Sequence, residues 1–462
     1  MPGYADWKQL YREEYYQMME EGYLVKDQKE DAQDTEELLP FPDEKENSQD
    51  TSSQRYWEEA YQRLMEAAQK GLRKDYPYTE PEKLQEILQL AESMPELEPL
   101  ERKVYASRIA GAVTGRFAGV VLGKPLEMGF DRRQVKEYLE STGQYPLQDF
   151  VEAYSSKLDI RLREDCIPST RGNVQYVQPD DDVHYTILSL LLAEEKGETF
   201  SGDDIGWLWT ENLPYRWVWC ASRQAYYHYI NLDERRDRDS QIREFPKKLN
   251  PWRECIDGQI RTDLWGYLHP ADPLDAAETA YRDCSFSLIK NGVYAGMFTA
   301  ACISAAMSAS PAVQDILDAG LAVIPRTSRL AEAVKNVRIW YEESNGNWIK
   351  ACDRIYDRYG NLPFASAVGN MAMVVLALLH GNLDYTRTIT TAVMCGMDTD
   401  CNAGTAGSIV GAAVGEAGIP DQWKKPLNDT VKTAVAGFGE GKISDICNRI
   451  IQVYDRYLNM KT

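Results

Sequence analysis

The sequence predicts an all-α protein, and three observations support this fold class. Alanine-rich segments with apolar residues at helical spacing recur through the second half of the chain. Four glycines recur at every fourth position between residues 111 and 123, a spacing that lines up one face of a helix. Alternating valine and isoleucine patterns, which are typical of half-buried strands, are nearly absent. We therefore expect many helices that cross at small residues.

The first hundred residues form a separate acidic extension in this interpretation. They carry 25 acidic and 11 basic side chains, so they hold −14 of the formal net charge of −21. Residues 4–23, 56–72 and 82–94 have apolar side chains at helical spacing, and the polar stretch 27–53 is typical of a linker. This extension either covers apolar surface of the main domain or presents a surface to a partner.

The main domain, residues 101–462, opens with the glycine-rich helix. Its four regularly spaced glycines are Gly111, Gly115, Gly119 and Gly123. Glycine costs up to about 1 kcal/mol per site relative to alanine in a helix, so the pattern needs a compensating contact, most simply a very closely packed second helix. Pro125 ends the helix, and Glu127 follows it either in a cleft or in an exposed loop.

Helical spacing recurs after this point in five alanine-rich or small-residue segments. They cover residues 273–284, 294–308, 365–379, 391–394 and 404–414. A different segment, residues 207–229, holds eight tryptophan and tyrosine side chains. Such a segment either builds core or offers flat surfaces on which a nucleobase can stack.

Two acidic runs lie far apart in the sequence. The first run is Asp180, Asp181 and Asp182, and the second contains Asp398 and Asp400. Carboxylates this close together repel one another unless they meet a positive charge. Hard divalent cations such as Mg²⁺ prefer oxygen ligands, so five carboxylates suit one ion or a close pair. A solvated surface is the alternative, but both runs adjoin segments typical of buried helices, residues 185–193 and 403–414.

Composition excludes several classes of protein and site. The four histidines form no H-E-x-x-H pair and the nine cysteines no C-x-x-C pair, which disfavours a zinc site. The strongly negative charge disfavours nucleic acid and anionic membranes as partners. No apolar run approaches the roughly 20 residues needed to cross a bilayer, and the first residues lack a basic and apolar leader. Scattered cysteines in odd number fit a reducing compartment, so we expect a cytoplasmic protein.

Taken in order, these motifs form a larger pattern. It runs from the glycine helix and Glu127 through residues 180–182, 260–263 and 290–294 to Gly-Met-Asp-Thr-Asp at 396–400. The pattern resembles the ADP-ribosylglycohydrolase family over roughly residues 101–455. The resemblance implies an orthogonal multi-helix bundle, a site with two Mg²⁺ ions (Mn²⁺ in some members), and removal of ADP-ribose from a modified protein or a small conjugate.

The resemblance also assigns roles to individual residues. The implied metal ligands are Asp180, Asp181, Asp182, Asp398, Asp400 and Cys401. The implied substrate contacts are Gly123, Asn291, Gly292, Tyr294, Gly404 and Thr405. Glu127 matches a glutamate that positions or activates water. Independently of the resemblance, backbone amides of residues 404–407 are candidates to bind an anionic diphosphate, provided that they lie at a helix N-terminus.

Four positions depart from the family pattern. Asp180 and Cys401 stand where threonines are usual, Leu288 stands where many members have a histidine near the ribose, and Val120 replaces an aspartate. At Cys401 the family threonine helps to hold metal, so either the coordination is reduced here or Asp180 compensates. The changes at Leu288 and Val120 concern the usual substrate more than the metal site.

The expected activity is hydrolysis of a ribosyl C1″ bond. Such a reaction passes through an oxocarbenium-like state, with water attacking near the metal and Glu127 taking its proton. Two alternatives stay open: a hydrolase of another nucleoside or N-glycoside, and a module that binds ADP-ribose without turnover.

Overall fold

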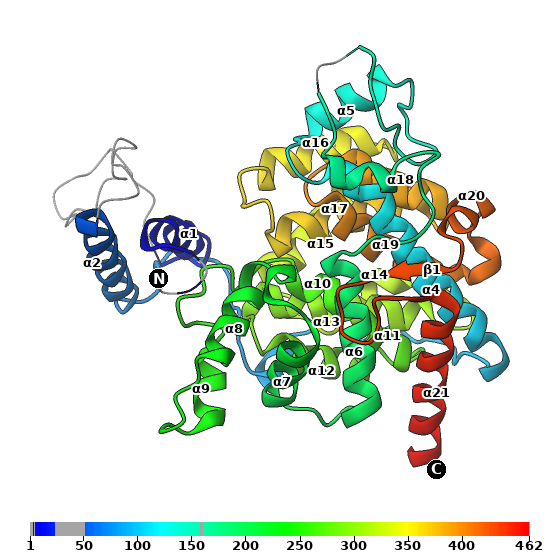
Figure 1. Cartoon of the computed structure of the whole chain (residues 1–462). Helices are drawn as coiled ribbons and strands as arrows, with labels where there is room; N and C mark the ends of the chain where they lie inside the picture. Colours follow the sequence, from blue (N-terminus) through cyan, green and yellow to red (C-terminus); the bar gives the residue numbers. More distant parts are fainter. Residues whose placement is uncertain (1–2, 4, 24–50, 158–159, 462) are drawn as a thin grey trace.

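The computed structural model has the all-α architecture that the sequence predicts (Figure 1). It describes residues 3, 5–23, 51–157 and 160–461. Within this part of the chain, strands occur only as a short antiparallel pair, β1 (Thr430–Lys432) with β2 (Glu440–Lys442).

Helices follow one another through the described chain. The N-terminal part contains α1 (Trp7–Glu20), α2 (Thr51–Ala68) and α3 (Leu84–Gln89). The first half of the main domain contains α4 (Arg102–Gly123), α5 (Arg132–Ser141), α6 (Asp181–Lys196), α7 (Gly202–Asn212), α8 (Cys220–Ile230), α9 (Arg238–Glu244), α10 (Asp257–Arg261), α11 (Asp263–Leu268) and α12 (Pro273–Cys284). The second half contains α13 (Lys290–Ala306), α14 (Val313–Leu321), α15 (Arg329–Glu343), α16 (Trp348–Tyr359), α17 (Ala367–Gly381), α18 (Tyr385–Cys395), α19 (Thr399–Val414), α20 (Asp421–Lys424) and α21 (Ile443–Lys461). The 3-10 helices are η1 (Lys124–Leu126), η2 (Glu164–Ser169), η3 (Tyr215–Trp217), η4 (Glu416–Gly418) and η5 (Lys425–Leu427).

The extension shows where the predicted boundaries were wrong. α2 begins at Thr51 instead of residue 56, since threonine and serine are common at helix starts, and it stops before Gly71, whose φ is 89°. α3 is only six residues long, because the Leu90 carbonyl accepts a hydrogen bond from the Arg326 N–H at 2.9 Å instead of continuing the helix. Residues 27–50 of the predicted linker lie outside the described residues.

The main core surrounds α13, α17 and α19. Every residue of α13 after Lys290 is buried, and α17 and α19 each leave a single residue that is not buried. Helices without a polar face occur where other elements cover them on all sides. The alanine and glycine content that predicted these helices also allows them to lie at the centre of the domain.

β1 holds the chain on both sides of the first acidic run. Val177 forms a parallel bridge with Val431, in which its N–H and its carbonyl each make a 2.9 Å hydrogen bond to the backbone around β1. His184, four residues after Asp180, accepts a hydrogen bond from the Ala434 N–H at 3.0 Å. These contacts within the protein therefore hold the start of α6 in place without a bound ligand.

α1 and α2 form a pair with an apolar core of their own at one side of the main domain (Figure 1). The Tyr11 and Trp57 rings lie 5.4 Å apart, and those of Trp7 and Tyr61 lie 5.6 Å apart. α3 belongs to the main core instead, because Ile87 is fully buried in it.

The α1–α2 pair contacts the main domain through buried ion pairs. Arg253 binds Glu21 at 2.6 Å and Glu14 at 2.8 Å, and Lys290 binds the second oxygen of Glu21 at 2.5 Å. Arg329 continues this network with several carboxylates. It lies 2.7 Å from Glu80, 2.7 Å from Glu254 and 3.8 Å from Glu20.

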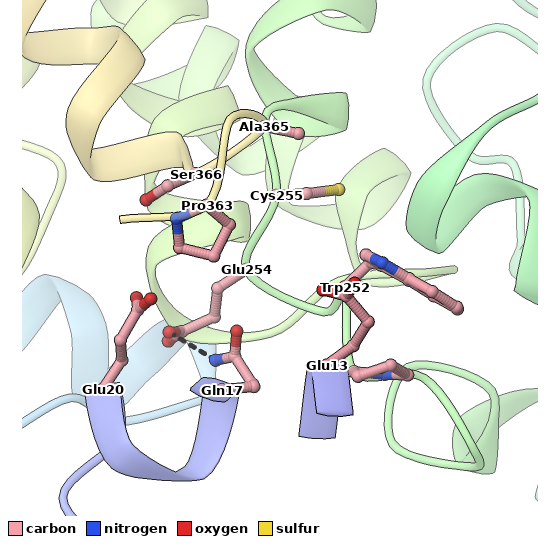
Figure 2. Close-up of a pocket in the computed structure, with 10 residues that line it drawn as sticks. Glu13, Gln17, Glu20, Trp252, Glu254, Cys255, Pro363, Ala365 and Ser366 are labelled. Atoms are coloured by element: carbon pink, nitrogen blue, oxygen red, sulfur yellow. Dashed lines mark hydrogen bonds between the residues drawn. The ribbon is translucent and has the colours of Figure 1, made fainter. Parts of the chain in front are cut away.

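A small cavity remains where α1 meets the loops of the main domain (Figure 2). α1 lines it with Glu13, Gln17 and Glu20, and the opposite wall contains Trp252, Glu254, Cys255 and Ser366. Gln17 Nε2 donates to Glu254 Oε2 at 2.9 Å across the interface. The cavity measures about 30 Å³, which leaves room for water but not for a nucleotide.

Candidate metal centre

α4 and α19 pack backbone to backbone along the predicted glycine face. A methyl group added to any of the four α4 glycines would come within 3.0 Å of main-chain atoms of α19. Gly407 and Gly411 of α19 meet the backbone of α4 in the same way. The closely packed partner that the sequence required is therefore the helix that carries the second acidic run.

This packing fixes the first turn of α19 against the end of α4. Thr399 Oγ1 donates to the Gly123 carbonyl at 2.8 Å. Asn370 of α17 supports the same turn, since its Oδ1 accepts the Asp398 N–H at 3.2 Å and Asn402 Nδ2 at 2.8 Å. Sequence reasoning missed Asn370, because one amide inside an apolar helix carries no local signal.

Two cations hold the first acidic run at the start of α6. Asp180 accepts the Asp182 N–H through Oδ1 at 3.1 Å and pairs with Lys124 through Oδ2. Arg116 of α4, fully buried, binds Asp182 at 3.0 Å and Asp263 at 3.1 Å. Neither cation was singled out from the sequence, although Lys124 directly follows the last glycine of the helix.

The two acidic runs meet at one place. Cys401 Sγ donates to Asp182 Oδ2 at 3.0 Å and so joins the start of α19 to the start of α6. Asp398 and Asp400 each keep a buried Oδ1 atom that has no hydrogen-bond partner among the described residues. The predicted convergence of these carboxylates is therefore present in the structure.

Burial and mutual repulsion change the protonation of this cluster. Burial, followed by the charge of Asp180, raises the pKa of Asp400 to about 6. Burial and neighbouring carboxylates raise the pKa values of Asp181 and Asp398 well above their ordinary range. At Asp180, burial would raise the pKa, but the Lys124 ammonium outweighs it and the pKa falls below the ordinary value. The cluster contains more carboxylates than its neighbouring cations, Lys124 and Arg116, can neutralise.

Glu127 faces the same cluster. It is half-buried and directly follows η1, next to the exposed Met128. Burial, then the charges of Asp400 and Asp180, raise the pKa of Glu127 well above the ordinary value. A carboxylate with this surrounding holds a proton more firmly than one in water.

The donor set fits a hard divalent cation. Unpaired buried oxygens such as those of Asp398 and Asp400 cost free energy that an ion would offset. Asp181 is half-buried and lies between two aspartates that already bind cations. The Cys401 thiol is a soft donor, which suits Mg²⁺ poorly, and its proton is used to bind Asp182.

Three of the predicted substrate contacts lie beside the acidic runs. A methyl group on Gly123 would meet the backbone of Thr399 and Asp400, and one on Gly404 would lie 3.6 Å from Asp182 Oδ1. Thr405 Oγ1 accepts a hydrogen bond from Gln259 at 3.3 Å.

The diphosphate-binding role suggested for the amides of residues 404–407 needs correction. α19 begins at Thr399, so these amides lie beyond its first turn, where helix hydrogen bonds already use them. The Asn402 N–H already donates to the Asp398 carbonyl at 3.0 Å, so the amides of α19 without a helical partner precede Asn402.

Asn291, Gly292 and Tyr294 lie beneath the chain that leads out of the extension. Asn291 Nδ2 donates to Glu80 at 2.8 Å, and Tyr294 donates its hydroxyl to the Pro81 carbonyl. A methyl group on Gly292 would meet the Arg253 carbonyl at 2.8 Å. All three side-chain positions are buried, so a substrate role for them stays a prediction.

The aromatic segment builds core in part, as one of its two interpretations predicted, and leaves two of its tryptophans exposed. Trp209 and Tyr229 are buried, whereas Trp207 and Trp219 are 48% and 50% exposed. Trp217 packs edge to face on His184 of α6, with ring centroids 5.1 Å apart. The segment therefore builds core and also adjoins the helix that carries the first acidic run.

Comparison with known proteins matches this architecture to a family. The sequence profile described as ADP-ribosylglycohydrolase matches residues 101–457. The chain belongs to the ADP-ribosylglycohydrolase family. Members of the ADP-ribosylglycohydrolase family are generally hydrolases and commonly depend on metal.

Other comparisons add less about this ADP-ribosylglycohydrolase family member. A solved structure titled "ADP-ribosylglycohydrolase-related protein complex" matches 76% of this chain and 99% of that chain, with 16% identity and a TM-score of 0.47. No curated protein matches the sequence. None of the helices in the described part of the chain combines the length and apolarity needed to cross a membrane.

One departure from the ADP-ribosylglycohydrolase pattern has a clear structural setting. Leu288 is buried, and its methyl groups would lie within 3.2 Å of a methyl group placed on Gly258 or Gly292. A leucine here fills space between two glycines and offers no hydrogen bond.

Proposed function

We propose that this member of the ADP-ribosylglycohydrolase family is a Mg²⁺-dependent hydrolase that cleaves the ribosyl C1″ bond of an ADP-ribosylated protein or small conjugate. The observation that carries the proposal is the meeting of two acidic runs at the starts of α6 and α19, where Asp398 and Asp400 keep unpaired buried oxygens. Asp181, Asp398 and Asp400 would hold the metal, supported by Asp180 and Asp182.

Glu127, whose charged neighbours include Asp400 and Asp180, is the residue to which we assign the proton transfer. In the proposed reaction, the oxygen of water bonds to C1″ as the glycosidic bond breaks, and Glu127 accepts the proton of that water. The departing group takes up a proton in turn. One or two bound Mg²⁺ ions, or Mn²⁺, would fix the ribose hydroxyls and neutralise the surrounding carboxylates. Burial and the charges of Asp400 and Asp180 raise the pKa of Glu127, so its ionised form is a stronger base than an ordinary glutamate.

A second candidate is a hydrolase of a smaller nucleoside or N-glycoside. The observation that favours it is the cover over Asn291 and Tyr294, whose polar atoms bind Glu80 and Pro81 of this same chain. A ribosyl group needs only the metal centre and Glu127, whereas a longer diphosphate conjugate needs further contacts.

Titration calorimetry with ADP-ribose, in Mg²⁺ and then in chelator, tests the proposal when it is followed by hydrolysis assays on arginine- and serine-linked ADP-ribosyl peptides. Metal-dependent binding with release of ADP-ribose supports the hydrolase. Binding without release indicates a module that reads ADP-ribose. If ADP-ribose does not bind but simple ribosides are cleaved with Mg²⁺, the second candidate is favoured.

A further inference from the structure

Three metal-ligating side chains come together outside the carboxylate cluster. They are Cys220, the first residue of α8, Cys255 in the loop before α10, and Asp257, the first residue of α10. One ligand atom of each lies within 4.8 Å of the other two. Cys255 Sγ donates to Asp257 Oδ1 at 2.9 Å. The sequence did not reveal this group, because its two cysteines are 35 positions apart and match no metal-binding spacing.

The backbone around the group is held firmly. The Ser222 N–H donates to Asp257 Oδ2 at 2.7 Å, which leaves Oδ1 directed toward Cys255. Cys255 forms an antiparallel bridge with Ser366, and the neighbouring Ile256 N–H donates to the Ala365 carbonyl at 2.8 Å. Figure 2 shows Cys255 beside Ala365 in this arrangement.

Cys220 occupies a backbone conformation that is uncommon for its residue type. Its φ is 45°, in the left-handed region that glycine adopts most easily. It is also half-buried, whereas the other eight cysteines of the chain are buried. Cys255 and Asp257 are both buried, so the group has one accessible side.

The chemistry of the group suits a thiolate-preferring cation. In a tetrahedral zinc site with metal–sulfur bonds of about 2.3 Å, neighbouring donor atoms lie about 3.5–3.8 Å apart. The three ligand atoms here lie within 4.8 Å, and the pair formed by Cys255 Sγ and Asp257 Oδ1, 2.9 Å apart, has a proton between sulfur and oxygen. A divalent cation that replaces this proton requires that pair to separate by only about 0.6–0.9 Å.

We propose that Cys220, Cys255 and Asp257 form a binding site for a divalent cation of the zinc class, separate from the carboxylate site of the proposed hydrolase. Binding forms two metal–sulfur bonds and one metal–oxygen bond, and it releases the two thiol protons to solvent. The ion ties the start of α8, and with it the aromatic segment, to the loop that leads into α10. Mg²⁺ does not compete, because it prefers hard oxygen donors.

Cobalt(II) is the probe for this site, added to the reduced, metal-free, full-length protein. Thiolate coordination gives an intense charge-transfer absorption in the near ultraviolet, which carboxylate coordination does not give. The expected result is one equivalent of Co²⁺ bound with this band, which Zn²⁺ removes and excess Mg²⁺ leaves unchanged. In excess Mg²⁺, which occupies the proposed carboxylate site, calorimetry in two buffers of different ionisation enthalpy should count close to two released protons per bound Co²⁺.

Matched variants separate this site from the carboxylate cluster. Cys220→Ser and Cys255→Ser should each lose most of the band, whereas Cys401→Ser, which removes the thiol beside Asp182, should keep it. Because Cys220 is half-buried, its variant tests the site even if Cys255→Ser folds poorly, and far-ultraviolet circular dichroism checks folding. The proposal is overturned if the natural protein gives no band, or if the band survives Cys220→Ser and disappears in Cys401→Ser. It is also overturned if Cys220 and Cys255 form a disulfide and the reduced protein binds no Co²⁺.

Discussion

Asp180 and Asp398 show how differently the carboxylates of the metal centre are placed. Asp180 is neutralised by Lys124, whereas no described cation pairs with Asp398, whose Oδ1 is buried without a hydrogen-bond partner. A buried charge without a partner destabilises the fold, so in the proposed site we expect the second run to contribute most to metal affinity and least to stability without metal.

Replacing both residues of the second run should remove metal binding. In Asp398→Asn with Asp400→Asn, the side chains keep their shape but lose the charge that attracts the ion. We expect the Mg²⁺-dependent rise in melting temperature to vanish, while the melting temperature in chelator rises. Thermal unfolding with and without Mg²⁺ measures both effects, and unchanged Mg²⁺ affinity would refute the site.

Glu127→Gln separates binding from turnover. The amide cannot accept the proton of water, but it removes none of the five aspartates. We expect metal and ADP-ribose affinity to stay within a few-fold and turnover to fall by about 10²–10⁴. Calorimetry measures the two affinities, and a hydrolysis assay measures the turnover rate. A fully active variant would mean that a different group takes the proton.

At the scale of elements, the contact between α4 and α19 sets the distance between the acidic runs. A methyl group on Gly119 would meet the Ala403 carbonyl within 3.0 Å, and neither backbone can move without shifting a whole helix. Gly119→Ala should therefore cost more than the about 1–3 kcal/mol typical of overpacking, and it should also weaken Mg²⁺ binding.

Gly441→Ala is the matched control for this substitution, because no atom lies within 4 Å of the added methyl group. Denaturant unfolding of both variants measures the difference in free energy. Equal stability of the two variants would contradict the packing argument.

The docking of α1 should depend on pH through Glu20. Burial, partly opposed by Arg329, raises the pKa of Glu20 to about 8, and nearby Glu254, Glu21 and Glu80 add to the shift. A pKa above the ordinary value means that neutral Glu20 favours docking. The contribution of neutral Glu20 to the docking of α1 is complete below the ordinary pKa of glutamate and is lost as pH rises through about 8.

Hydrogen exchange of residues 7–20 tests this dependence. Protection should fall between pH 6 and pH 9, after correction for the intrinsic exchange rate. Glu20→Gln should flatten the profile, whereas Glu66→Gln, on the exposed side of α2, should not. A natural protein with constant protection across this range would exclude Glu20 as the titrating group.

Local patterns predicted some helices well and could not predict how they pair. α12 was predicted over its full length, because Pro273 begins it and alanine spacing continues to its end. The glycines predicted a close partner for α4, but several other helices are equally rich in small residues. Only the tertiary fold shows that the partner is α19.

The acidic ligands could be found from the sequence, but their supports could not. Runs of aspartates are visible in the local sequence. Arg116, Lys124 and Asn370, in contrast, lie 28 to 66 positions away in the sequence from the aspartates that they hold. The grouping of Cys220 with Cys255 is hidden for the same reason.

At the scale of the whole molecule, the extension and the main domain share a buried set of charges. Removing residues 1–75 would leave Arg253 without Glu14 and Glu21, and an uncompensated buried charge costs about 3–5 kcal/mol. We expect such a truncated protein to fold with a lower melting temperature.

Removing residues 1–95 should lower the melting temperature further, because Ile87 and the Glu80 partner of Arg329 are lost as well. Differential scanning calorimetry of the two truncations compares the effects. Equal melting temperatures for both truncations would show that α3 adds nothing to the main core.

The contact between α4 and α19 also bears on how quickly metal can arrive. The end of α4 touches the main chain of Thr399 and Asp400, so the apoprotein already holds the backbone of the second acidic run in place. Uptake of the ion should then be a single bimolecular step whose rate rises linearly with Mg²⁺ concentration. No slower ordering phase should follow, unlike in small domains that fold around their metal.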